Sequence, residues 1–114
     1  NPFLRKIPLA VPWFKNMSGE SDLEELSVNL PDLLSETLEF TGYFKMLDRR
    51  AFLMDSKNPD ILASQINFRN WTAIGTELLI TGGLRMEDGL METELRLFDT
   101  IKGKLIIGKR YKGR

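Results

Sequence analysis

Hydrophobic residues recur along this chain at two spacings, and each spacing predicts one kind of element. In residues 7–13 apolar side chains alternate with others, which is typical of a β-strand. From Leu23 to Leu38 leucines recur at helical intervals, which predicts an amphipathic helix. Pro31 should kink or restart this helix, and Gly42 is placed to end it in the left-handed conformation.

The middle of the chain contains shorter elements. Residues 43–47 predict a short strand, and the polar segment Met54–Ile66 predicts a surface loop. A second helix of about two turns follows, because Asn67 can cap its start and Gly75 can end it.

A β-hairpin is the clearest element of the second half. Two strands, 77–87 and 90–99, flank Asp88-Gly89, a dipeptide suited to a tight type I′ turn. The turn sets a register with one apolar face and one polar face, and it places Arg85 opposite Glu92. A last strand is predicted over 104–111.

The order of these elements predicts the fold class. Strand, helix, strand, helix and three further strands are typical of an α+β domain, here with a mixed five-stranded sheet and two main helices packed on one face. The first strand-helix-strand unit should be parallel. The length of 114 residues fits one domain.

Two adjacent glycines, Gly82 and Gly83, lie inside the first hairpin strand. A phosphate-binding glycine loop leads from a strand into a helix, whereas this pair leads into more strand, so a structural role is favoured. On the apolar face, Gly82 should allow the helix that bears Trp71 to approach. Gly83 should face outward beside Glu94.

Composition removes several classes of chemistry. The chain has no Cys and no His, which excludes thiol nucleophiles, cysteine zinc sites and histidine bases. Glu92 and Glu94 share the polar strand face, where we expect basic or solvent neighbours around both rather than the apolar pocket that a catalytic pair needs. We therefore predict no enzyme activity, no cofactor and no metal. No apolar run has the length of a membrane span.

Charge is balanced overall, with 16 basic and 16 acidic residues, but it is unevenly distributed. Residues 102–114 contain six basic residues and no acidic one. An exposed strand face is the favoured interpretation, and a nucleic-acid-binding stripe is the alternative.

The N-terminal segment is a candidate partner-binding site, formed by Asn1, Pro2, Phe3, Leu4 and Arg5. Its apolar residues suit packing on the domain's own core and addition as a strand to a partner's sheet equally well.

Four stretches, in order, resemble the amino-terminal domain of the TolB family of the Tol-Pal system. They are IPLAVPWFKN, TLEFTGYFKMLDRR, NWTAIGTELLITGGL and DGLMETELRLFDTIKGKLIIGKRY. The resemblance implies an α+β domain that is similar in fold to anticodon-binding domains, the source of the nucleic-acid alternative. It also implies that residues 1–114 are an excised domain, which a further helix and a C-terminal β-propeller follow in the family.

Family members are non-catalytic periplasmic proteins. The resemblance implies binding of TolA at the inner membrane through the N-terminal segment, and of Pal and other outer-membrane lipoproteins mainly through the propeller. These contacts support envelope integrity and cell division, and colicins exploit them. We expect the domain itself to be monomeric, without nucleic-acid binding or membrane insertion.

Overall fold

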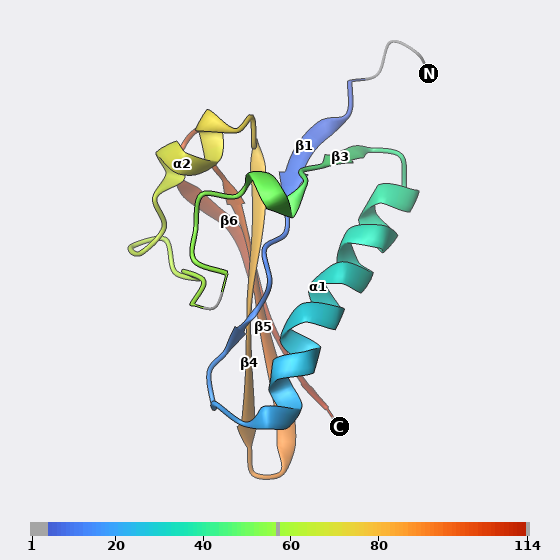
Figure 1. The fold of residues 1–114 in the computed structure, drawn as a ribbon, viewed down its shortest axis with the longest axis vertical. Helices are drawn as coiled ribbons and strands as arrows, with labels where there is room; N and C mark the ends of the chain where they lie inside the picture. The colour runs from blue at the N-terminus through green and yellow to red at the C-terminus, as the bar shows by residue number, and fades with distance from the viewer. Residues whose placement is uncertain (1–4, 57, 114) are drawn as a thin grey trace.

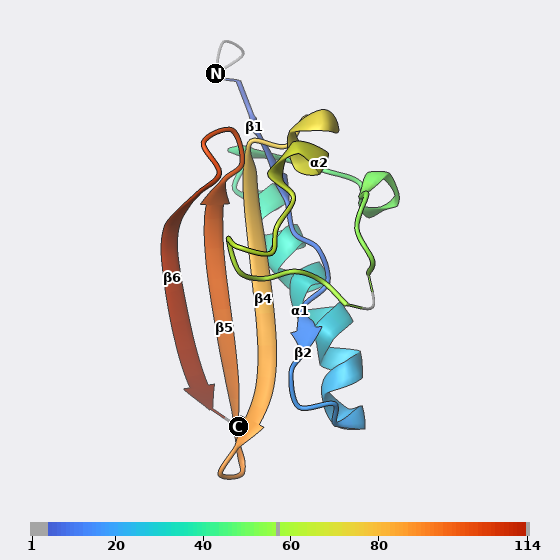
Figure 2. The ribbon, with the colours of Figure 1, turned by 90° about the vertical axis from the view of Figure 1, so that its left-hand side faces the viewer.

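The computed structural model describes residues 5–56 and 58–113. Its elements form one mixed sheet with a helix on each face (Figures 1 and 2). In chain order they are β1 (Ile7–Ala10), β2 (Lys15–Asn16), α1 (Ser21–Phe40), β3 (Phe44–Met46), the 3₁₀ helix η1 (Arg49–Ala51), α2 (Phe68–Ala73), β4 (Leu78–Glu87), β5 (Leu90–Asp99) and β6 (Lys104–Gly113).

The sheet confirms the predicted α+β class but differs in strand number. Its order is β3-β1-β4-β5-β6, and the two-residue strand β2 pairs with β4, so six strands are present rather than five. β1 runs parallel to β3, which confirms the prediction for the first strand-helix-strand unit, and it also runs parallel to β4. A two-residue strand carries no periodicity in sequence, which is why β2 was not predicted.

The hairpin confirms the predicted register. Asp88 and Gly89 have φ values of 53° and 76°, and β4 pairs with β5 from Glu87 opposite Leu90 to Leu78 opposite Asp99. β5 then pairs antiparallel with β6, with a bulge between Leu97 and Phe98.

The prediction that both helices pack on one face is wrong. Leucines of α1 pack with Leu78, Ile80 and Leu84, whereas Trp71 of α2 packs with Leu79 and Phe98 on the opposite face. Figure 1 shows the sheet nearly edge-on between the helices. Because β4 opens with three consecutive apolar residues, both of its faces need cover, and α2 with the preceding loop supplies the second.

Helix α1 continues through Pro31, which is buried. Proline has no N–H, so it leaves the carbonyl of Ser27 without its usual helical donor. The backbone N–H of Phe14 donates to that carbonyl at 2.8 Å. The proline therefore creates a point where the β1–β2 connection is fastened to the helix.

The two glycines of β4 are both buried, each beneath a different side chain. A Cβ at Gly82 would lie 2.4 Å from Cδ1 of Phe14, so the predicted close approach is present, but Phe14 makes it rather than the Trp71 helix. A Cβ at Gly83 would lie 2.6 Å from Sδ of Met17, so the outward placement of Gly83 is wrong.

Candidate interaction surface

Of the predicted N-terminal site, Arg5 is the only residue within the part of the chain that the structure describes. Asn1, Pro2, Phe3 and Leu4 lie outside the described residues. The Arg5 side chain is 67% exposed and forms an ion pair with Glu77, which immediately precedes β4. The glutamate interactions raise the pKa of Arg5, first through the hydrogen bond and then through charge. Arg5 is thus accessible and only loosely held.

Glu92 and Glu94 have the basic neighbours that the sequence predicts, but both side chains are buried rather than surrounded by solvent. Arg85 and Arg96 bind the two carboxylate oxygens of Glu94 at 2.9 and 2.8 Å. Arg85 lies opposite Glu92 in the register but forms its ion pair diagonally with Glu94. A carboxylate held by two guanidinium groups is suited to stabilising a structure rather than to transferring a proton.

Glu92 has a weaker ion pair than Glu94. Its carboxylate lies 3.7 Å from Nζ of Lys112, whose side chain is 54% exposed. Lys112 belongs to β6, so this contact joins the hairpin to the last strand. Of the basic residues near the chain end, Lys112 thus takes part in an ion pair within the sheet.

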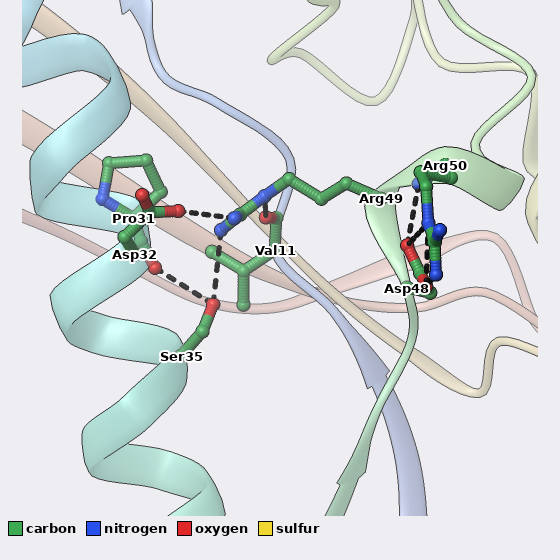
Figure 3. A network of polar contacts seen from close by, with 7 residues as sticks. All are labelled: Val11, Pro31, Asp32, Ser35, Asp48, Arg49 and Arg50. Atoms are coloured by element: carbon green, nitrogen blue, oxygen red, sulfur yellow. Dashed lines mark hydrogen bonds and ion pairs between the residues drawn. The ribbon is translucent and has the colours of Figure 1, made fainter.

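The Asp-Arg-Arg stretch at 48–50 contains two arginines with different roles, which Figure 3 shows. Arg49 points into the molecule, where it pairs with Asp32 of α1 and donates from Nε to the carbonyl of Val11 at 2.9 Å. Arg50 turns outward and pairs with Asp48 at 2.7 Å. Sequence spacing alone did not distinguish these neighbouring arginines.

The strand β6 forms one edge of the sheet, and all ten of its residues are exposed (Figure 2). Tyr111 and Ile107 lie on the face toward α1, with Lys109 between them, whereas Arg110 lies on the other face. The basic residues of the chain end are therefore divided between two faces rather than gathered in one stripe. The nucleic-acid alternative stays a prediction.

A groove separates α1 from β5 and β6. It is lined mainly by apolar side chains, namely Phe14, Leu30, Leu33, Leu34, Thr37, Met91, Thr93, Leu95 and Tyr111. Leu33 is 60% exposed and Tyr111 is 52% exposed, although large apolar and aromatic side chains are usually buried. Sequence analysis missed this surface, since Leu33 fits the apolar helical pattern that normally indicates a core position.

The described residues contain neither a metal-binding cluster nor a membrane-spanning helix. Among residues 5–56 and 58–113, no group of three His, Cys, Asp or Glu side chains is placed so that it could hold a metal ion. Neither helix in this part of the chain combines the length and the apolarity that crossing a membrane requires.

Comparison with known families identifies the chain. The family model described as the TolB amino-terminal domain matches residues 1–106. The chain belongs to the TolB amino-terminal domain family. Within this TolB domain, Arg49 of the motif that carried the resemblance fastens η1 to α1, which is a structural role.

Relatives of this TolB domain extend well beyond it. The Tol-Pal system protein TolB of Desulfosudis oleivorans is 46% identical over all 114 residues, which are 26% of its length. The protein of the same name from Syntrophotalea carbinolica is 34% identical over 98% of the chain and 26% of its own length. The chain thus spans about a quarter of the length of these curated relatives.

Solved structures share the TolB domain's fold. TolB from Acinetobacter baumannii superposes with a TM-score of 0.66 at 18% identity, over 93% of this chain and 23% of that one. The LpoB C-terminal domain from Escherichia coli gives 0.74 at 11% identity, over 100% of this chain and 87% of that one. At these identities the likeness concerns the fold alone.

Proposed function

We propose that this chain is a non-catalytic protein–protein interaction domain of a periplasmic Tol-Pal component. In the full-length parent, which we propose also carries a further helix and a C-terminal propeller, it helps to connect TolA at the inner membrane with Pal at the outer membrane. The match of the TolB amino-terminal domain over residues 1–106 carries this proposal. Curated relatives named Tol-Pal system protein TolB support it further.

The N-terminal segment Asn1–Arg5 is the proposed contact with TolA. Arg5 supports this role because its side chain is exposed and its partner is a single surface carboxylate, that of Glu77. An exposed ion pair contributes little to stability, so a carboxylate of a partner is able to replace Glu77 at low cost. The ion pair between Arg5 and Glu77 also holds Arg5 beside the start of β4.

Titration of the full-length parent with TolA and with Pal, each measured separately, tests the function. We expect both to bind, and we expect removal of residues 1–5 to weaken TolA binding while leaving Pal binding unchanged. If the intact parent binds neither protein, the proposed function is wrong. If the deletion leaves TolA binding intact, the assignment of the segment is wrong.

A matched pair of arginine variants refines the second outcome. Arg5→Ala should weaken TolA binding, because it removes the one described side chain of the proposed site. Arg50→Ala should have no effect, although Arg50 is also exposed and also pairs with one carboxylate, that of Asp48. Equal losses in both variants would indicate a general charge effect rather than a site at the N-terminus.

A further inference from the structure

The last strand of the sheet is open along its outer edge. β6 is ten residues long and pairs only with β5 among the described elements, so its outer backbone N–H and C=O groups face solvent. The opposite edge strand, β3, has only three residues. Short edge strands discourage pairing with other chains, whereas a long exposed strand offers a template for an added strand.

The charge of β6 restricts which strand is able to pair with it. Within Lys104–Gly113 four residues are basic and none is acidic. A second copy of β6 would bring eight positive charges to one seam, which opposes self-pairing. A strand that carries acidic residues would instead meet charges of opposite sign.

The two faces of β6 favour different residue types in such a strand. On the face away from α1, Arg110 has no ion-pair partner among residues 5–56 and 58–113, and Lys112 reaches Glu92 only at 3.7 Å. On the face toward α1, Ile107 and Tyr111 are about half exposed with Lys109 between them, and Tyr111 borders the apolar groove beside Leu33. Because side chains alternate between faces, the complementary strand alternates acidic and apolar residues.

We propose that β6 binds an extended segment of a partner protein as an additional strand, in which acidic residues face Arg110 and Lys112 and apolar residues face Ile107 and Tyr111. This surface is separate from the N-terminal segment, so the inference goes beyond the proposed function. Backbone hydrogen bonds supply affinity in this binding mode, and the alternation of side chains supplies specificity.

A synthetic peptide of about nine residues, in which glutamate alternates with valine, is a suitable probe because its length matches β6. We expect saturable binding to the 114-residue chain, with amide signals of β6 shifting in NMR spectra and those of β3 unchanged. A peptide of the same composition, with its glutamates and valines in separate blocks, should bind at least about tenfold more weakly.

Backbone methylation separates strand addition from simple charge attraction. Alternate amides of a strand point to opposite edges, so methylating one alternate set of the peptide removes the donors toward β6, and methylating the other set does not. We expect one set to weaken binding about tenfold or more and the other to have little effect. Equal affinities of the two methylated peptides would overturn the proposal.

Reversing the charge of single residues tests whether the peptide binds at β6. Arg110→Glu should weaken binding of the glutamate–valine peptide about fivefold or more, and a lysine–valine peptide should recover part of the loss. Lys45→Glu is the matched control, since Lys45 is an exposed residue of the other edge strand. Circular dichroism checks that both variants fold. If the reversed charge prevents folding, Arg110→Gln replaces Arg110→Glu in the comparison.

Three further results would contradict the proposal. They are no peptide binding, a loss in Lys45→Glu equal to that in Arg110→Glu, and a dimer in sedimentation analysis whose interface is β6. Deleting residues 1–5 should leave peptide binding unchanged, so failure of the TolA titration and failure of this inference are distinguishable.

Discussion

The ring of Phe14 lies against the backbone of Gly82, where a side chain would have no room. A Cβ at position 82 would come within 2.4 to 2.7 Å of three ring atoms of Phe14, and Phe14 is itself only 4% exposed. Its backbone N–H is also held, by the Ser27 carbonyl. Because Phe14 is buried and its backbone is held, its ring has little room to shift away from position 82.

Substituting Gly82 by valine should destabilise the fold by about 1–3 kcal/mol through overpacking. Gly108→Val is the matched control, because a Cβ there would meet nothing closer than 3.8 Å on exposed β6. Urea denaturation of both variants measures the difference in the free energy of unfolding. Equal stability of Gly82→Val and the unmodified chain would contradict the close approach of Phe14.

Arg49→Ala should cost about 1–3 kcal/mol of stability, because it leaves the carbonyl of buried Val11 without its donor and breaks the contact with Asp32. Arg50→Ala should cost clearly less stability, since its ion pair is on the surface and is screened by solvent. Thermal and chemical unfolding of the two variants provide the comparison. A larger loss for Arg50→Ala would reverse the two assigned roles.

Glu94→Gln should destabilise the sheet more than Glu92→Gln. Glu94 is buried between two arginines, so its neutralisation leaves Arg85 and Arg96 close together without their shared counter-ion, at a cost of about 1–3 kcal/mol. Glu92 has only a distant, half-exposed lysine to lose. Unfolding free energies near neutral pH test the order, and equal losses would mean that the diagonal pair is not important.

The pKa of Asp48 should be visibly low in the folded protein. Hydrogen bonds from the side chain and then the backbone of Arg50 lower it from 3.8 to about 2. Because the folded protein favours the charged form, the associated stabilisation is present above about pH 4 and is lost as the pH falls through about 2.

Carboxyl NMR titration of Asp48 measures this shift directly. In Arg50→Ala the pKa should rise toward 3.8, but not fully, since the backbone N–H of residue 50 still donates to Asp48. A midpoint in the unmodified chain near 3.8 would mean that the pair does not form in solution.

Local patterns along the chain were sufficient to predict most elements. Turn chemistry at Asp88-Gly89 and alternation in the flanking strands predicted a register that the structure confirms residue by residue. Asn67 caps α2 through its side chain, and Gly42 and Gly75 adopt positive φ at the ends of the helices. These features depend on neighbours in sequence, so sequence contains the information.

Placement of these elements in space was beyond the same reasoning. The alternation that separates apolar from polar residues in β4 and β5 does not say whether the polar face meets solvent or another segment. In the fold, Ile61 of the loop accepts a hydrogen bond from Thr81 through its carbonyl and packs near Gly83, so that face is partly covered. Burial of Glu92 and Glu94 follows from this cover and from the cations of three strands.

The candidate surfaces divide in the same way. A run of basic residues near the chain end can be recognised in the sequence. Its division between the two faces of β6 follows only from the register with β5, in which Lys109 lies opposite Leu95 and Arg110 lies opposite Glu94. The unpaired edge of β6 is likewise a tertiary property. Every strand has two edges that can pair, and only the order of the strands in the sheet determines which of them stays unpaired. Sequence supplied the strands and their side chains, and the order of the sheet decided which of them remained exposed.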